Sequence, residues 1–174
     1  MTRILGIDPG SLLTGWAVIV HDGSRMQRVA SGVIRTGGEE FTRRLRIIAR
    51  DIASIVEQHA PDEVVVERAF VHKNADSALK LGHARAAAIC GTFARDMPVY
   101  EYAPRDVKQA VVGTGAASKE QVQQMVGLLL KLKDALQADE ADALAVALTH
   151  ALRRSVNSRL AVELAGSRTG RRRR

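Results

Sequence analysis

Apolar residues along this chain recur with two periods, one typical of strands and one typical of helices. Short apolar runs predict five strands, at residues 4–7, 15–20, 29–35, 63–67 and 98–102. Recurrence every three or four residues, clearest at Ile48, Ile52 and Ile55, predicts amphipathic helices. The expected helices span residues 41–60, 75–95, 105–112, 118–130 and 139–154. Three strands in succession, then two that alternate with helices, predict an α/β fold with a central five-stranded mixed sheet flanked by helices.

Length and composition predict one folded domain with a tail. The 174 residues, 46% of them hydrophobic, suffice for one substantial core but are few for two domains. We assign residues 1–154 to the domain and residues 155–174 to a basic, flexible tail. The single cysteine, Cys90, excludes an internal disulfide, and the sequence contains neither a signal peptide nor a run of about 20 apolar residues. We therefore expect a cytoplasmic protein without membrane contact.

The net charge of +7 suggests a polyanionic partner, but the charge is unevenly distributed. Residues 1–152 contain 18 Lys and Arg against 18 Asp and Glu, whereas residues 153–174 contain eight Arg against Glu163 alone. The tail is therefore either a non-specific contact for nucleic acid or a solvated, disordered terminus. The neutral body would attract phosphate only if its acidic residues bound cations.

Four carboxylates occur where acidic residues are usually avoided. Asp8 and Glu67 each end an apolar strand, and parallel neighbouring strands would bring them together at one edge of the sheet. Asp139 and Asp142 lie three residues apart, which places both on one face of the last helix, whereas Glu140 points elsewhere and is expected in solvent. The alanines around them would allow this helix to approach the sheet closely. All four acids are thus expected at one site.

Taken singly, each acid has a structural alternative: Asp139 as a helix N-cap, Glu67 as a charge at a strand end, Asp8 as a turn residue before Pro9. Together they require neutralisation, because two like charges about 4 Å apart repel by roughly 4 kcal/mol at an effective dielectric near 20. Carboxylate oxygens without cysteine favour Mg²⁺ or Mn²⁺ over zinc. Of the five histidines, only His72 and His150 are expected near the acids, and none has zinc-ligand spacing. Two such ions could catalyse phosphodiester hydrolysis.

Several motifs closely resemble the RuvC-type Holliday-junction resolvases over roughly residues 4–150. They are Gly6-Ile7-Asp8-Pro9-Gly10-Ser11 with Thr14-Gly15, Glu67 with Phe70 and the segment 73–82, Val107-Lys108-Gln109, Val111-Val112-Gly113, and the segment 139–145. The resemblance implies an RNase H-like fold, a homodimer, and Mg²⁺-dependent nicking of two opposed strands of a four-way DNA junction that leaves 5′-phosphate and 3′-hydroxyl ends. It also implies work with the RuvA-RuvB branch-migration machinery in recombination and repair.

Matched position by position, the resemblance implies roles for individual residues. The four acids correspond to the metal-binding catalytic quartet, with two Mg²⁺ per site. Phe70 corresponds to an aromatic ring that stacks on unpaired bases at the junction centre, with core packing as the alternative. Lys108 and Lys119 correspond to lysines that face DNA phosphate. Weaker phosphate-contact candidates, equally explained by a solvated helix face, are Lys73, Lys80 and Arg85.

A stripe of small residues on the second predicted helix has two interpretations. Ala78, Gly82, Ala86, Cys90 and Ala94 recur every four positions, which would suit packing on the monomer's own sheet or a dimer contact.

Two rival functions also remain. The opening Gly6–Ser11 turn is similar to that of phosphotransferases of the actin and sugar-kinase superfamily, although this chain lacks their length and internal duplication. A non-catalytic junction-binding protein is the other alternative.

Overall fold

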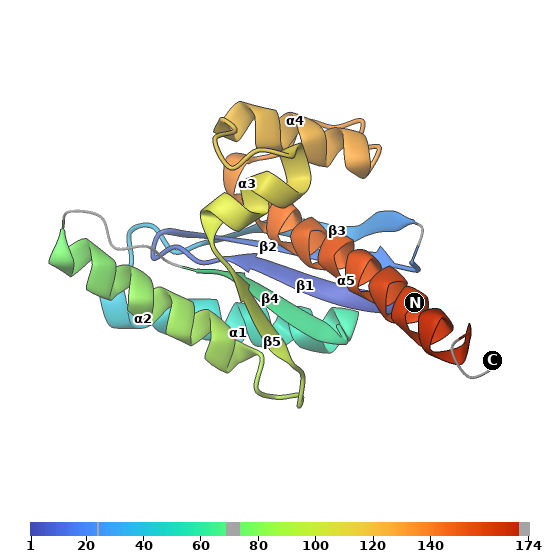
Figure 1. Ribbon diagram of the computed structural model, residues 1–174. Coiled ribbons are helices and arrows are strands. Elements are labelled where there is room, and N and C mark those ends of the chain that lie inside the picture. The colour runs from blue at the N-terminus through green and yellow to red at the C-terminus, as the bar shows by residue number, and fades with distance from the viewer. Residues whose placement is uncertain (24, 69–73, 171–174) are drawn as a thin grey trace.

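The computed structural model contains a central sheet covered by helices on both faces (Figure 1). It describes residues 1–23, 25–68 and 74–170, with the backbone alone for residues 158–170. The strands are β1 (Thr2–Asp8), β2 (Leu13–His21), β3 (Met26–Arg35), β4 (Glu63–Glu67) and β5 (Val99–Tyr102). The helices are α1 (Phe41–His59), α2 (Ala75–Gly91), α3 (Pro104–Val112), α4 (Lys119–Leu129) and α5 (Ala138–Gly170).

The sheet is mixed and has the strand order β3-β2-β1-β4-β5. The pairs β1–β2 and β2–β3 are antiparallel hairpins, whereas β1–β4 and β4–β5 are parallel. Parallel pairing requires a crossover, and α1 and α2 supply the two crossovers. The predicted five-stranded mixed sheet is confirmed.

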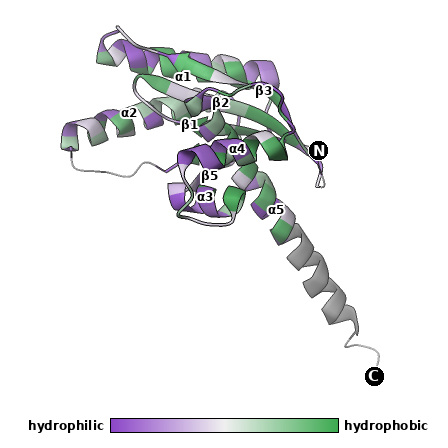
Figure 2. Cartoon of the chain, turned by 90° about the horizontal axis from the view of Figure 1, so that it is seen from above, coloured by the Kyte–Doolittle hydropathy of each residue, from purple (hydrophilic) through white to green (hydrophobic). Residues whose placement is uncertain are grey.

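Alternation along the strands divides the core into two layers. Leu5 and Ile7 of β1 face α1 and α2 and pack with Ile48 and Ile52. Ile4, in the opposite phase, faces the layer formed by α3, α4 and α5. In Figure 2 the strands in the middle of the molecule are mostly hydrophobic, while α1 alternates between hydrophilic and hydrophobic positions. Gly6, Asp8 and Glu67 therefore share the α5 face of the sheet.

Local sequence signals explain most element boundaries. Ser118 caps α4 in a capping box with Gln121, one residue before the helix begins. Helix α2 ends at Gly91 and not near Arg95, and the hydroxyl of the following Thr92 donates to the Ile89 carbonyl. A Cβ at position 91 would lie 2.6 Å from the Ala49 carbonyl oxygen, so Gly91 lets α2 pack closely on α1. Helix α5 continues past the predicted end at Arg154 to Gly170. The division at residue 154 and the flexible tail stay predictions.

The stripe of small residues on α2 does not pack on the sheet of its own chain. The buried residues of α2 are Ala84, Ala88 and Gly91, whereas Gly82, Ala86 and Cys90 are exposed. The interpretation of the stripe as packing within the monomer is therefore wrong. No helix in the described ranges is long and apolar enough to cross a membrane.

Candidate active site

Asp8 and Glu67 end two adjacent parallel strands. Ile7 pairs with Val66 in the β1–β4 ladder, so the two acids occupy the next position on each strand. Both project on the α5 face, because strand residues alternate between the faces. The predicted meeting of these two acids at the carboxyl edge of the sheet is confirmed.

Helix α5 brings Asp139 and Asp142 to the same edge through an unusually close backbone approach. Gly15 pairs with Asp8 across the β1–β2 ladder, and a Cβ at position 15 would lie 2.0 Å from the Asp139 carbonyl oxygen. A Cβ at Gly6 would lie 2.4 Å from the Ala143 carbonyl oxygen. Only glycine permits such contact, so these two glycines set the first turns of α5 directly on β1 and β2.

The electrostatics of the two strand-end acids reflect the carboxyl groups around them. Burial, followed by the charges of Glu67 and then of the two α5 aspartates, raises the pKa of Asp8 to about 8. Burial and then Asp142 raise the pKa of Glu67 above its ordinary value. A hydrogen bond between Asp8 and Glu67 counteracts part of that rise in the Glu67 pKa. At least one proton or cation is therefore needed at this edge near neutral pH.

Two lysines partly supply that positive charge. The Lys119 ammonium lies 2.7 Å from an Asp142 oxygen, and this hydrogen bond raises the pKa of Lys119. Lys108 lies close enough to lower the pKa of Glu67, after the larger effect of Lys119. The resemblance assigns both lysines to DNA phosphate, and both lie beside the acids.

The donor set fits a hard divalent cation, although the side chains are not arranged around one. Within the described ranges, no three Asp, Glu, His or Cys side chains are grouped so that they could hold one ion. Asp142 is engaged by Lys119, which helps to explain this geometry. The donors are all carboxylate oxygens, and the raised pKa values of Asp8 and Glu67 show that their charged forms are disfavoured without a cation. Bound divalent ions would be held by Asp8, Glu67, Asp139 and Asp142.

The other predicted DNA contacts are dispersed. Lys80 forms an ion pair of 2.6 Å with Asp76 within α2. Arg85 is bound to Glu101 of β5, which also lies 3.7 Å from Arg68. Phe70, Lys73 and His72 lie outside the described residues. The DNA-contact roles of these residues stay predictions.

Two expectations about individual residues are wrong. Glu140 is not solvated: Ser31 donates to its carboxylate at 2.6 Å, and Arg28 lies 3.7 Å from it. It also accepts from the backbone N–H of Gln137, which precedes the helix, so Asp139 is not the N-cap. These contacts hold the start of α5 against β3.

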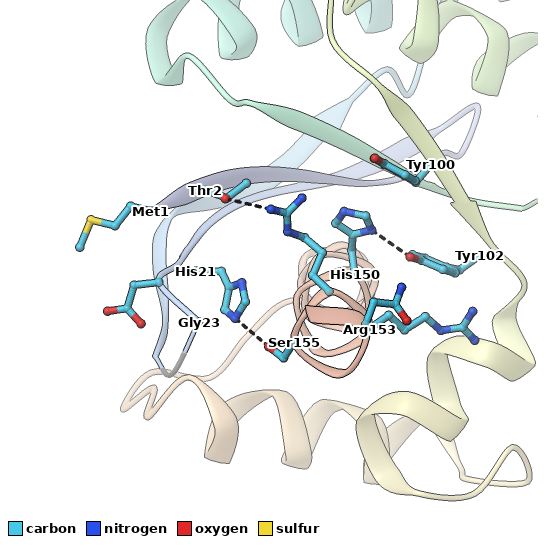
Figure 3. A pocket seen from close by; sticks show the side chains of 12 residues that line it. Met1, Thr2, His21, Gly23, Tyr100, Tyr102, His150, Arg153 and Ser155 are labelled. Atoms are coloured by element: carbon cyan, nitrogen blue, oxygen red, sulfur yellow. Dashed lines mark hydrogen bonds between the residues drawn. The ribbon is translucent and has the colours of Figure 1, made fainter. Parts of the chain in front are cut away.

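His150 lies at the opposite edge of the sheet from the acids, in a cavity of about 790 Å³ (Figure 3). Its Nε2 lies 2.7 Å from Glu63 and its Nδ1 lies 2.9 Å from the Tyr102 hydroxyl. The carboxylate can only accept, so Nε2 donates to Glu63 and Nδ1 accepts from Tyr102. Burial lowers the pKa of His150 despite the opposing effect of Glu63, which agrees with a neutral imidazole.

Arg154 completes this network by pairing with Glu63, and the Arg153 guanidinium lies 4.7 Å from the centre of the Tyr102 ring. Although the cavity is large, its polar groups are largely engaged with one another, and it contains no acid cluster comparable to Asp8 and Glu67. The cavity is therefore a weaker candidate for the functional site than the edge with the four acids. The local signal for this network is Glu63 at the start of an apolar run, but its partner His150 lies 87 positions away, so the pairing is apparent only in the fold.

Fold and site together define an α/β protein of the RNase H-like kind with a carboxylate site at the edge of its sheet. The family model described as "Crossover junction endodeoxyribonuclease RuvC" matches residues 4–150. The chain belongs to this family, and the predicted resemblance and fold class are confirmed. The interpretation as an actin-like or sugar-kinase phosphotransferase is wrong.

Individual relatives cover nearly the whole chain. The RuvC of Xanthomonas campestris pv. campestris (strain B100) is 52% identical over 164 residues, covering 93% of this chain and 94% of the relative. The RuvC of Tolumonas auensis (strain DSM 9187 / NBRC 110442 / TA 4) is 51% identical over 171 residues, covering 98% and 99%. The solved structure of T. thermophilus RuvC in complex with Holliday junction substrate has a TM-score of 0.84 at 34% identity, covering 90% of this chain and 97% of that one.

Proposed function

We propose that this protein is a Holliday-junction resolvase that nicks two opposed strands of a four-way DNA junction in recombination and repair. Family membership over residues 4–150 supports the activity and substrate. The observation that supports the location of the chemistry is the group of four carboxyl groups at one sheet edge, where burial and the charges of the other three acids raise the pKa of Asp8 to about 8.

The carboxylates act as ligands and not as nucleophiles. Asp8 and Glu67 offer oxygens from rigid strand ends, and Asp139 and Asp142 offer oxygens from α5. Two Mg²⁺ ions, or Mn²⁺, bound there would supply an activated water and stabilise the leaving 3′-oxygen, giving a 5′-phosphate and a 3′-hydroxyl.

Lys119 and Lys108 then position the scissile phosphate. Lys119 pairs with Asp142 in the metal-free protein, and its ammonium would be available to a phosphate oxygen if Asp142 instead held a cation. Lys108, on α3, is close enough to Glu67 to lower its pKa and would reach the same phosphate.

A cleavage assay with a four-way junction, linear duplex and single strands, with and without Mg²⁺, tests the function. We expect cleavage of the junction alone and only with the metal. The Asp8→Asn variant should bind the junction without cutting it. Equal cleavage of all three substrates would contradict junction specificity, and binding without cleavage by the parent protein would favour the non-catalytic junction-binding alternative.

We also propose that the protein works as a homodimer formed through α2, in contact with RuvA and RuvB. The exposed face of α2 contains a shallow apolar depression of about 560 Å³ beside Leu79, which is 63% exposed. A two-fold dimer presents two identical sites to two opposed strands.

The variant Ala86→Glu places a charge on that α2 face and should yield monomers in sedimentation that no longer cut both strands in one binding event. A parent protein that is monomeric at working concentration and still resolves junctions would contradict the dimer.

A further inference from the structure

Glu140 is an acid in the first turn of α5 that the four-acid site does not include. It lies between Asp139 and Asp142 in sequence, yet its side chain is only 14% exposed and is bound to β3. The Ser31 hydroxyl donates to one Glu140 oxygen at 2.6 Å, and the Arg28 guanidinium lies 3.7 Å from the same oxygen. The other oxygen accepts from the backbone N–H of the residue just before the helix, at 3.4 Å. The carboxylate therefore joins β3 to the start of α5.

A break in the regular pairing of β2 with β3 brings both partners of Glu140 to one face of the sheet. Along a regular strand, residues three positions apart, such as Arg28 and Ser31, would face opposite sides. Here Val29 has no partner in β2, as in a β-bulge, and Arg28 pairs with Ile19. Ser31 pairs with Ala17, and both β2 partners belong to the core layer that contains α5. Since directly paired residues share a face, the extra residue turns both Glu140 partners toward α5.

The attachment of Glu140 bears on the two aspartates because all three residues share one helical turn. Successive helical residues are about 100° apart, so Glu140 lies about 160° around the axis from Asp142. Any rotation of this turn that separates Glu140 from β3 therefore also displaces Asp139 and Asp142. The glycine contacts of β1 and β2 set how closely α5 approaches the sheet, and the attachment at β3 fixes its rotation. The charges of both aspartates help to raise the pKa of Asp8, so this rotation places both near the strand-end acids.

We infer that Glu140, held by Ser31 and Arg28, is a positioning residue that fixes the first turn of α5 so that its two aspartates can bind divalent ions together with the strand-end acids. The inference rests on the proposed function, because it concerns how the same four acids are held. Glu140 acts through the helix, since its own carboxylate is bound to β3. A site whose ligands are not held in place must order them when the ion binds, which weakens its affinity for the ion.

The substitution Ser31→Ala tests the inference, because it removes the hydrogen bond to Glu140 and leaves every charge in place. The Mn²⁺ concentration that half-saturates the DNA-free protein, measured by electron paramagnetic resonance, should rise about 10-fold, the lower end of the range for groups that support metal ligands. The Mg²⁺ concentration for half-maximal junction cleavage should rise by the same factor. At saturating Mg²⁺ the cleavage rate should return to that of the parent protein.

Arg28→Met separates positioning from simple electrostatics. Loss of a positive charge near the acids would by itself strengthen cation binding, whereas loss of a partner of Glu140 should weaken it. We expect the half-saturating Mn²⁺ concentration to rise, and a fall would overturn the inference. Glu63→Gln is the matched control, because it weakens the contacts of a strand acid with a later part of α5. It should lower the melting temperature without changing the half-saturating Mn²⁺ concentration.

Two further results would overturn the inference. One is an unchanged or lower half-saturating Mn²⁺ concentration in Ser31→Ala. The other is a rise of equal size in Glu63→Gln, because the effect would then reflect a general loosening of α5. Failure of the parent protein to cut junctions would instead contradict the proposed function itself.

Discussion

Glu63 and Glu67 stand at the two ends of β4 and face the same helix, yet their surroundings are opposite. At one end, α5 presents His150 and Arg154, and Glu63 binds both. At the other end, α5 presents Asp139 and Asp142, and the charge of Asp142 helps to raise the pKa of Glu67. A buried acid that is paired with an arginine and a neutral histidine of its own chain needs no external ion, whereas a buried acid among other acids creates a demand for an external cation.

The same substitution at both ends of β4 tests whether the two acids have different roles. Glu67→Gln should lower junction cleavage more than about 100-fold, because losing a metal ligand costs more than the 10- to 100-fold typical of a group that only supports a ligand. Junction binding should persist, and the metal-free protein should be at least as stable as the parent. Cleavage kinetics and thermal unfolding without metal measure the two effects. Near-normal cleavage would remove Glu67 from the catalytic site.

A second prediction separates the position of α5 from the chemistry of its acids. Gly15→Ala places a Cβ against the Asp139 carbonyl oxygen, so α5 must shift, and we expect a loss of about 1–3 kcal/mol in unfolding free energy with reduced cleavage. Gly127→Ala in α4 is the control, since nothing lies within 4 Å of a Cβ there. It should stabilise the protein slightly. Equal urea midpoints for the two variants would contradict the close approach.

At the Glu63 end the expected effect is on stability alone. Glu63→Gln removes the charge that Arg154 binds and weakens the bond with His150, so we expect a loss of about 1–3 kcal/mol. Cleavage by the folded variant should match the parent, because the network lies at the far edge from the acids. Denaturant unfolding and cleavage below the melting temperature provide the readouts. A selective loss of cleavage in a stable variant would show that Glu63 contributes to catalysis and would contradict this prediction.

The last prediction concerns the pH dependence of stability in the metal-free protein. Because folding raises the pKa of Asp8 from 3.8 to about 8, the metal-free folded state binds more protons than the unfolded state between these values. Its stability should therefore fall as pH rises from about 4 to about 8, by at most about 1.4 kcal/mol per pH unit for this group. Asp8→Asn should flatten the profile. A metal-free melting temperature that rises over this range and is insensitive to Asp8→Asn would contradict the argument.

Much of the fold could be predicted because its elements carry local signals. The apolar periods located all five strands and the five helices, and the positions of Asp8 and Glu67 at strand ends followed from parallel pairing. Errors arose where a distant residue decided the outcome. Glu140 looked solvated because nothing near it in sequence indicates Ser31 and Arg28 of β3. His150 was expected near the acids, but α5 carries it to the other end of β4, beside Glu63.

The sequence by itself determined which residue types the site contains: four carboxylates without a built-in cation on the same elements, and motifs of the RuvC family. The tertiary structure brings Lys119 to Asp142, and it gives Glu63 partners that Glu67 lacks. The physical reason is the distance along the chain over which each interaction acts. Periodicity and capping act over a few residues, whereas the pKa of a buried carboxyl depends on charges within several ångströms that the sheet order and the two glycine contacts bring from distant parts of the chain.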